Sequence, residues 1–160
     1  MNIYKKFLPQ DVFIKLKDTM MGDCFPWYFN DFINYTGEKG DYFQFTYTFI
    51  RKGEYTCWGE GKDIMIPVLK NIKHKKMNRV KSNLLTRTDK IFQYAFHTDQ
   101  DNGTTGILYL NNCNGYTIFK NGKKVMSEEN KYIEFDSTLD HTGSSCTDEM
   151  RRVVINFNYV

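Results

Sequence analysis

Short β-rich segments run through the chain from residue 79 to its last residue, and they limit what it can fold into more than any other feature. Turn residues separate the segments, and no helical pattern lies between them. Strands this close in sequence pair antiparallel, because parallel pairing needs a long crossover. The pattern therefore predicts a barrel, a sandwich or a jelly roll. The expected strands cover residues 79–85, 91–98, 106–110, 116–119, 132–135 and 152–159.

Two Asn-Gly pairs, at residues 114–115 and 121–122, mark tight turns within this region. Both residue types tolerate the positive φ angles that such turns require. The second pair lies between Phe119 and Val125, so we expect it at the tip of a hairpin.

The first part of the chain is mixed. Apolar residues recur at helical spacing over residues 9–21, and Gly22 is a natural stop. Aromatic and β-branched residues then predict strands at 25–29 and 42–50. A second amphipathic helix is expected around residues 64–72, where Pro67 is tolerated only if it lies in the first turn. The predicted fold class is therefore mainly β with N-terminal helices (α+β).

Length and composition set the remaining limits. The 160 residues are enough for one domain, 1–160, and not for a second. A hydrophobic fraction of 41% with 16% aromatic residues excludes a disordered chain. The net charge of +3 is too small to argue for nucleic acid by itself.

The cysteines and the N-terminal residues indicate the cellular compartment. The wide spacing of the cysteines excludes a zinc knuckle and a dense disulfide framework, so we expect reduced thiols. No apolar run follows Lys5 and Lys6, which excludes a signal peptide and a spanning helix at this end. The expectation is a cytoplasmic protein with no membrane contact. The four cysteines are Cys24, Cys57, Cys113 and Cys146.

Two histidines and one aspartate form a candidate metal site. His97 and Asp99 are two residues apart where the expected strand 91–98 closes, so their side chains point to the same face. His141 follows 44 positions later, on a segment that a closed sheet can place alongside. Two imidazoles and one carboxylate form the facial set that binds Fe(II) and leaves positions open for a bidentate cosubstrate and dioxygen.

Simpler interpretations stand beside this one. A His-x-Asp tripeptide arises readily by chance as a surface or capping pair. His74 lies in a lysine-rich stretch, where a solvated helix end is the better interpretation. The same holds for the lysines of that stretch, Lys70, Lys73, Lys75 and Lys76.

An arginine follows on the last expected strand. Period-two alternation over residues 152–159 puts Arg152 on one face with Val154, Asn156 and Asn158. A guanidinium can hold a carboxylate in a bidentate fork, which would suit the far end of a dicarboxylic acid. Arg151 is the alternative, and the alternation favours Arg152.

At these residues the chain resembles the Fe(II)/2-oxoglutarate-dependent dioxygenases, in particular the prolyl-4-hydroxylase-like group in the short form met in phages. The resemblance covers residues 83–158. Tyr94-Ala95-Phe96-His97-Thr98-Asp99 is similar to the group's Tyr-x-x-His-x-Asp. Asn114-Gly115-Tyr116-Thr117-Ile118-Phe119 is similar to its Gly-Gly-x-Thr-x-Phe, with Asn114 in place of the first glycine.

The resemblance implies a double-stranded β-helix (jelly roll) and assigns roles. His97, Asp99 and His141 would bind iron, and Arg152 would bind the far carboxylate of 2-oxoglutarate. Asn83 and Tyr109 could add hydrogen bonds to this cosubstrate, although barrel-lining side chains of no special role would look the same. Dioxygen would be the second cosubstrate, and the reaction would be a hydroxylation.

The primary substrate is open at this point. A protein residue such as prolyl follows from the resemblance, and a nucleobase is the alternative. Trp27, Tyr28 and the loop 100–105 are candidate lid elements. Two alternative interpretations assign other functions. One is a non-enzymatic jelly-roll module, and the other is a cupin-type isomerase, whose metal site would need more histidines than the three in this chain.

Overall fold

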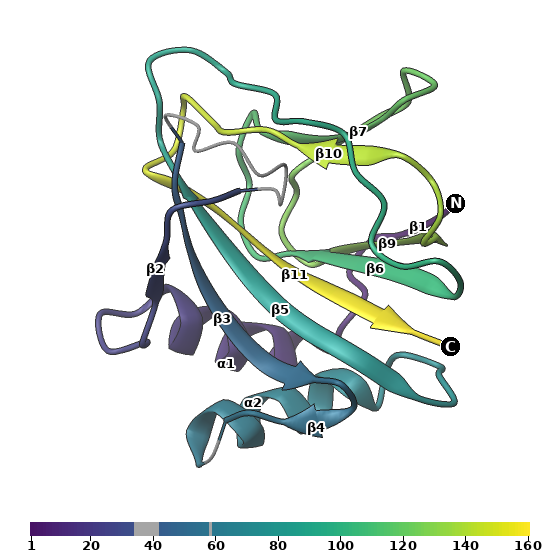
Figure 1. Ribbon diagram of the computed structural model, residues 1–160. Helices are drawn as coiled ribbons and strands as arrows, with labels where there is room; N and C mark the ends of the chain where they lie inside the picture. The colour runs from purple at the N-terminus through teal and green to yellow at the C-terminus, as the bar shows by residue number, and fades with distance from the viewer. Residues whose placement is uncertain (34–41, 58) are drawn as a thin grey trace.

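Two antiparallel sheets form the frame of the protein (Figure 1). The computed structural model describes residues 1–33, 42–57 and 59–160. In chain order the elements are β1 (Asn2–Tyr4), α1 (Gln10–Met21), β2 (Tyr28–Asn30), β3 (Gln44–Arg51), β4 (Glu54–Tyr55), α2 (Glu60–Leu69), β5 (Met77–Thr86), β6 (Thr104–Tyr109), β7 (Tyr116–Phe119), β8 (Lys124–Met126), β9 (Lys131–Asp136), β10 (His141–Gly143) and β11 (Arg151–Tyr159).

The strand order is that of a double-stranded β-helix, as expected. The larger sheet runs β1-β9-β6-β11-β5-β3-β2, with β4 paired to β3. The smaller sheet runs β10-β7-β8. Strands 79–85, 106–110, 116–119, 132–135 and 152–159 are confirmed as β5, β6, β7, β9 and β11, with ends shifted by one or two residues in most of them.

The segment 91–98 is the exception, because it is not a regular strand. It contributes two isolated bridges, Gln93 with Ser144 and His97 with His141. It therefore extends the smaller sheet beyond β10 without a continuous ladder. Most of its residues alternate between exposed and half-buried, so little packing holds the intervening backbone in strand geometry.

Both helices lie against the outer face of the larger sheet, on the side away from the smaller sheet (Figure 1). Helix α1 buries Phe13, Leu16 and Met20 there, at helical spacing. Among the described residues no helix is long and apolar enough to cross a membrane.

Pro67 lies in the last turn of α2, so the expectation of a first-turn proline was wrong. The helix begins at Glu60, earlier than the apolar stripe indicates. Proline leaves the carbonyl of Asp63 without its helical donor, but Asp63 is exposed, and water can satisfy it. The side chain of Asn71 donates to the Pro67 carbonyl oxygen at 2.9 Å and closes the helix end.

The expected strand 25–29 is also largely wrong. Only Tyr28–Asn30 pairs with β3, whereas Phe25 packs its ring against Trp27 and Tyr47. The aromatic side chains there serve the helix-facing core instead of a sheet. The hairpin at residues 121–122 is confirmed, since β7 and β8 pair across it and Gly122 has a φ of 85°.

Two hydrophobic cores result, one on each face of the larger sheet. The first lies between this sheet and the helices. The second lies between the two sheets, beside the functional pocket described below. It consists of Ile107, Tyr109, Phe119, Val125, Ile133, Phe135 and Val154.

Asn130 fastens the chain before α1 to the turn before β9. Its buried side chain accepts from the Leu8 N–H and donates to the Leu8 carbonyl, both at 2.9 Å. We expect Asn130→Ala to lower the free energy of unfolding by about 2–4 kcal/mol, because both Leu8 groups lose their partner and a non-glycine residue keeps a φ of 55°. Chemical denaturation measures this. Asn121→Ala, at the exposed hairpin tip, is the control and should cost below about 1 kcal/mol.

Candidate functional site

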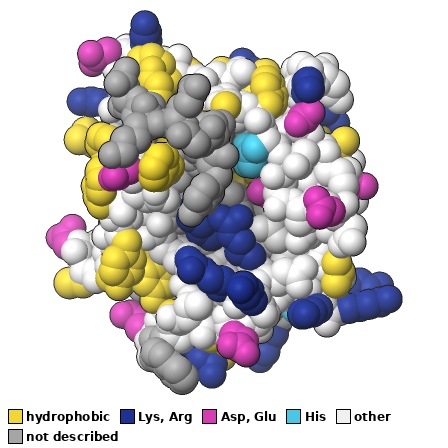
Figure 2. Space-filling view, viewed as in Figure 1, with side chains coloured by type: hydrophobic (Ala, Val, Ile, Leu, Met, Phe, Trp, Pro, Cys, Tyr) yellow, Lys and Arg dark blue, Asp and Glu magenta, His cyan; other side chains and the backbone are white. Residues whose placement is uncertain are grey.

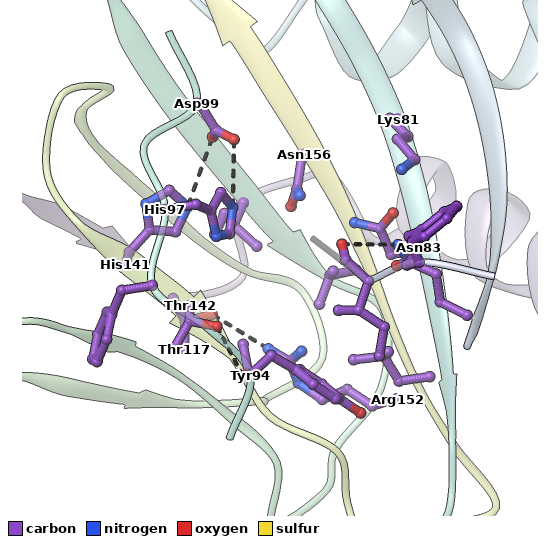
Figure 3. A pocket seen from close by; sticks show the side chains of 18 of the residues that line it. Lys81, Asn83, Tyr94, His97, Asp99, Thr117, His141, Thr142, Arg152 and Asn156 are labelled. Atoms are coloured by element: carbon purple, nitrogen blue, oxygen red, sulfur yellow. Dashed lines mark hydrogen bonds and ion pairs between the residues drawn. The ribbon is translucent and has the colours of Figure 1, made fainter. Parts of the chain in front are cut away.

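A pocket of about 390 Å³ opens between the two sheets (Figure 3). Its walls come from β5, β11 and β10, together with the segment that carries His97 and Asp99. Figure 2 shows its mouth as a hollow with basic side chains at its base and a histidine at its rim. The alternating residues of β5 and β11 that face the smaller sheet line it.

His97, Asp99 and His141 converge at one end of this pocket. One ligand atom from each lies within 4.8 Å of the others. His97 Nε2 is 3.8 Å from Asp99 Oδ1, and His141 Nε2 is 3.7 Å from Asp99 Oδ2. Two nitrogens and a carboxylate oxygen at this separation can bind one divalent cation of the Fe(II) type from one side.

Neighbouring groups hold two of the three side chains, His141 and Asp99, in place. His141 Nδ1 lies 3.0 Å from the Leu139 carbonyl oxygen, which fixes the proton on Nδ1 and leaves Nε2 free to coordinate. Asp99 Oδ2 accepts from the Thr105 hydroxyl at 2.7 Å and from Asn158 Nδ2 at 3.0 Å. The carboxylate therefore has a fixed orientation before any metal binds.

The protonation states suit metal binding. Burial lowers the pKa of His97, and the neighbouring His141 lowers it further. Burial raises the pKa of Asp99, but His141 and the hydrogen bond from Thr105 outweigh it, so this pKa lies below its ordinary value. At neutral pH His97 is neutral and Asp99 is ionised, the forms that coordinate a cation.

Arg152 lies at the other end of the pocket, on β11, and is only 2% exposed. Its Nε donates to the Ser127 hydroxyl at 2.8 Å, and its Nη2 donates to the Thr117 hydroxyl at 3.3 Å. The Tyr109 ring lies against the guanidinium, 5.7 Å from centroid to Cζ. No carboxylate of the described residues lies within 4 Å of it. A buried guanidinium held only by neutral groups is a site for an anion.

Glycine makes room for this side chain. A Cβ on Gly115 would lie 2.5 Å from Arg152 Cδ, and one on Gly143 would lie 3.2 Å from Nη1. Gly115 has no positive φ, so its value here is space and not turn geometry.

Arg151 lies outside the pocket, and the two expected cosubstrate contacts, Asn83 and Tyr109, differ in their surroundings. Arg151 turns away and donates to the Met21 carbonyl oxygen at the helix layer. Asn83 lines the pocket. Tyr109 is fully buried and donates to Thr117, so it supports the arginine site from behind.

Solved structures share this arrangement of elements. A prolyl hydroxylase from Trichoplax adhaerens, in complex with a hypoxia inducible factor oxygen degradation domain peptide fragment, matches with a TM-score of 0.66 at 10% identity, covering 99% of this chain and 82% of that one. A Pseudomonas putida prolyl-4-hydroxylase matches with a TM-score of 0.60 at 13% identity, covering 99% and 91%. The fold is prolyl-4-hydroxylase-like. A viral collagen prolyl hydroxylase from Paramecium Bursaria Chlorella virus-1 has a TM-score of 0.55 at 13% identity, covering 99% and 89%.

The sequence itself gives no such match. No protein-family model matches it, and no curated protein matches it. The likeness to the prolyl hydroxylases is therefore one of fold, at 10% and 13% identity.

Some expected elements lie elsewhere. Trp27 packs on the core and donates to the Met20 carbonyl oxygen, so it is not a lid over the pocket. Tyr28 and the loop 100–105 do not line the pocket either, whereas Asn30, Phe32 and Ile33 do. The four cysteines are free thiols, as expected.

Several residues in or beside the pocket have roles that the motifs did not indicate. Thr105 and Asn158 orient Asp99, and only the strand alternation that placed Asn158 on the Arg152 face pointed to it. Tyr94 lines the pocket near Arg152, and its burial raises its pKa to about 12, so it stays a neutral donor. Arg79 and Lys81 line the pocket from β5.

Removing the orientation of Asp99 should weaken metal binding without removing a ligand. We expect Asn158→Ala to lower the affinity for Co(II), used as a spectroscopic stand-in for Fe(II), by about 10- to 100-fold. A visible-absorbance titration measures it. Asn112→Ala, in the turn after β6, is the control. Unchanged Co(II) affinity in Asn158→Ala would contradict the role given to this amide.

Gly115 provides a test of the arginine site that removes no polar group. We expect Gly115→Ala to weaken binding of 2-oxoglutarate by at least about 10-fold, because the added methyl would lie 2.5 Å from Arg152 Cδ and 2.7 Å from the Ser145 carbonyl oxygen, so that Arg152 has to move. Calorimetry on the folded, Co(II)-loaded protein measures this. In Gly122→Ala, at the hairpin tip, no atom of the described residues lies within 4 Å of the added Cβ, so affinity should stay as in the parent although the φ of 85° makes the turn less stable. Equal affinities in all three proteins would exclude Arg152 as the anchor.

Proposed function

We propose that this chain is an Fe(II)- and 2-oxoglutarate-dependent oxygenase that hydroxylates its primary substrate, with residues 1–160 as one oxygenase domain. The observation that carries the proposal is the presence of two unlike sites in one pocket: a His-Asp-His cation site at one end and a buried, unpaired Arg152 at the other. A dicarboxylate that chelates the cation can reach toward the arginine with its far carboxylate.

Each residue has a defined task in this proposal. His97, Asp99 and His141 would hold the iron from one side, leaving the pocket side open. Arg152 would bind the distal carboxylate of 2-oxoglutarate, with Thr117 and Tyr94 positioned to add hydrogen bonds. When bound, iron and cosubstrate supply the oxidising power, with dioxygen consumed and 2-oxoglutarate converted to succinate and carbon dioxide.

The walls of the pocket supply the remaining needs of such a reaction. Phe119 and Phe135 pack against the His141 ring, at 6.1 and 4.7 Å between centroids, and keep water from that side of the site. His97 is 35% exposed on its side chain, so the open part of the site faces the mouth, where a substrate enters.

We favour a peptide residue such as prolyl as the substrate, because the Trichoplax adhaerens prolyl hydroxylase, which has the same fold, is solved in complex with a peptide. A nucleobase remains the alternative. A location in the cytoplasm, including that of a phage-infected host, stays a prediction.

An anaerobic titration tests the proposal directly. Apoprotein given Fe(II) and then 2-oxoglutarate should develop the visible charge-transfer band of the chelate, and admitting air should yield succinate. Asp99→Ala should abolish both, by at least about 100-fold in succinate formation, because the carboxylate ligand is lost.

Asp101→Ala, two residues away in the exposed loop, is the matched control and should behave as the parent. A folded protein that gives no band would falsify the oxygenase proposal. It would leave a jelly-roll binding or structural module in its place.

A further inference from the structure

Two basic side chains stand beside the iron site on the wall of the pocket. Arg79 and Lys81 are two residues apart on β5 and both line the pocket, while Val80 between them is buried in the helix-facing core. Arg51 of β3 is directly opposite Arg79 in the sheet register. Figure 2 shows Lys and Arg side chains gathered in the hollow on that face.

Neither of the two lining cations has an acidic partner. Within the described residues no carboxylate lies within 4 Å of Arg79 or Lys81, and Asp99 is the one acidic residue that lines the pocket there. The environment penalises the charge on Lys81: burial, followed by repulsion from Arg79 and Arg51, lowers its pKa to about 8. Partly buried cations that repel one another are stabilised when an anion joins them.

The iron and the cosubstrate do not supply that anion. This step rests on the proposed function. A ferrous ion and Arg152 bring three positive charges, while Asp99 and the 2-oxoglutarate dianion bring three negative ones, so the loaded centre is neutral. Arg79 and Lys81 are left over as two positive charges, on the side of the pocket that remains for the primary substrate.

Two unpartnered polar atoms of the pocket indicate which class of molecule carries the anion. Asn83 Oδ1 and Asn156 Oδ1 are buried acceptors without a hydrogen-bond partner in the described part of the chain. They need hydrogen-bond donors. A peptide offers a backbone N–H at almost every residue, whereas in a nucleic acid the phosphodiester backbone offers acceptors only and the N–H donors are confined to the bases. Unpartnered acceptors beside unpartnered cations therefore fit a peptide that carries an acidic side chain.

We propose that the primary substrate is an acidic peptide, in which a carboxylate side chain close to the hydroxylated residue binds Arg79 and Lys81. The carboxylate forms charge-assisted hydrogen bonds with both cations, and the adjoining backbone donates to Asn156. The residue to be hydroxylated then lies over the exposed edge of His97. Arg79 and Lys81 determine substrate choice and take no part in holding the metal or 2-oxoglutarate.

Fluorescence polarisation tests this without turnover. The protein is loaded with Fe(II) and 2-oxoglutarate under anaerobic conditions. The probes are three labelled peptides of about 15 residues that differ only in having Glu, Gln or Lys around a central proline, and an oligothymidylate of similar length. We expect the Glu peptide to bind at least about 10-fold more tightly than the Gln peptide. The Lys peptide should bind weakest.

Substitutions tie the preference to the two cations. Arg79→Gln and Lys81→Gln should each weaken binding of the Glu peptide by about 5- to 10-fold and leave the Gln peptide unchanged. Lys15→Gln, exposed on α1, is the matched control and should bind as the parent.

Equal binding of the Glu and Gln peptides would overturn the inference. So would oligothymidylate binding that is tighter than that of the Glu peptide and depends on Arg79 and Lys81, which would point to a nucleic acid instead. The charge-transfer band is read in the same samples. A band without peptide preference would support the oxygenase and overturn the acidic substrate. A peptide preference without a band would overturn the oxygenase and leave only an acidic-peptide binding site.

Discussion

Two backbone hydrogen bonds between His97 and His141 organise the site. Each residue donates its N–H to the carbonyl oxygen of the other at 3.0 Å. Residues that exchange both bonds stand directly opposite in an antiparallel pair, so their side chains leave the same face. Two imidazoles that are 44 positions apart in the chain are thereby placed with ring centroids 4.7 Å apart. Asp99 lies two residues after His97, and the hydrogen bonds from Thr105 and Asn158 orient its carboxylate so that it completes the three-residue site.

Arg152 differs from an ordinary structural arginine, because no carboxylate of the described residues pairs with it. Its neighbours are hydroxyls, a carbonyl oxygen and an aromatic ring, which satisfy its geometry without neutralising its charge. The larger sheet holds it from β11, and the smaller sheet supplies Thr117 from β7. An anion that binds there is consequently gripped between the two sheets. The packing of the two sheets is stiff, and it sets the position of this anion relative to the histidines.

Much of this could be predicted from the sequence, and the limits have physical causes. Period-two alternation on residues 152–159 placed Arg152 and Asn158 on the pocket face, because a strand with one buried face enforces that pattern. The segment 91–98 is irregular although it alternates between exposed and half-buried residues, because little packing holds its backbone and only two isolated bridges tie it to its neighbours. The position of Pro67 was missed because exposure of Asp63, a tertiary property, decides whether proline can be tolerated late in a helix. The roles of Thr105 and Tyr94 depend on contacts across the pocket, which no local pattern encodes.

The helix layer has a consequence of its own. Because α1 and α2 pack on the far face of the larger sheet, the side chains that hold them never reach the pocket, and the sheet separates two chemically independent compartments. Sequence drift in the helices can therefore adjust how firmly the scaffold is held, while leaving the reacting groups untouched. A scaffold divided in this way can tolerate wide divergence on one side and strict requirements on the other, which accords with a shared fold at about 10% identity.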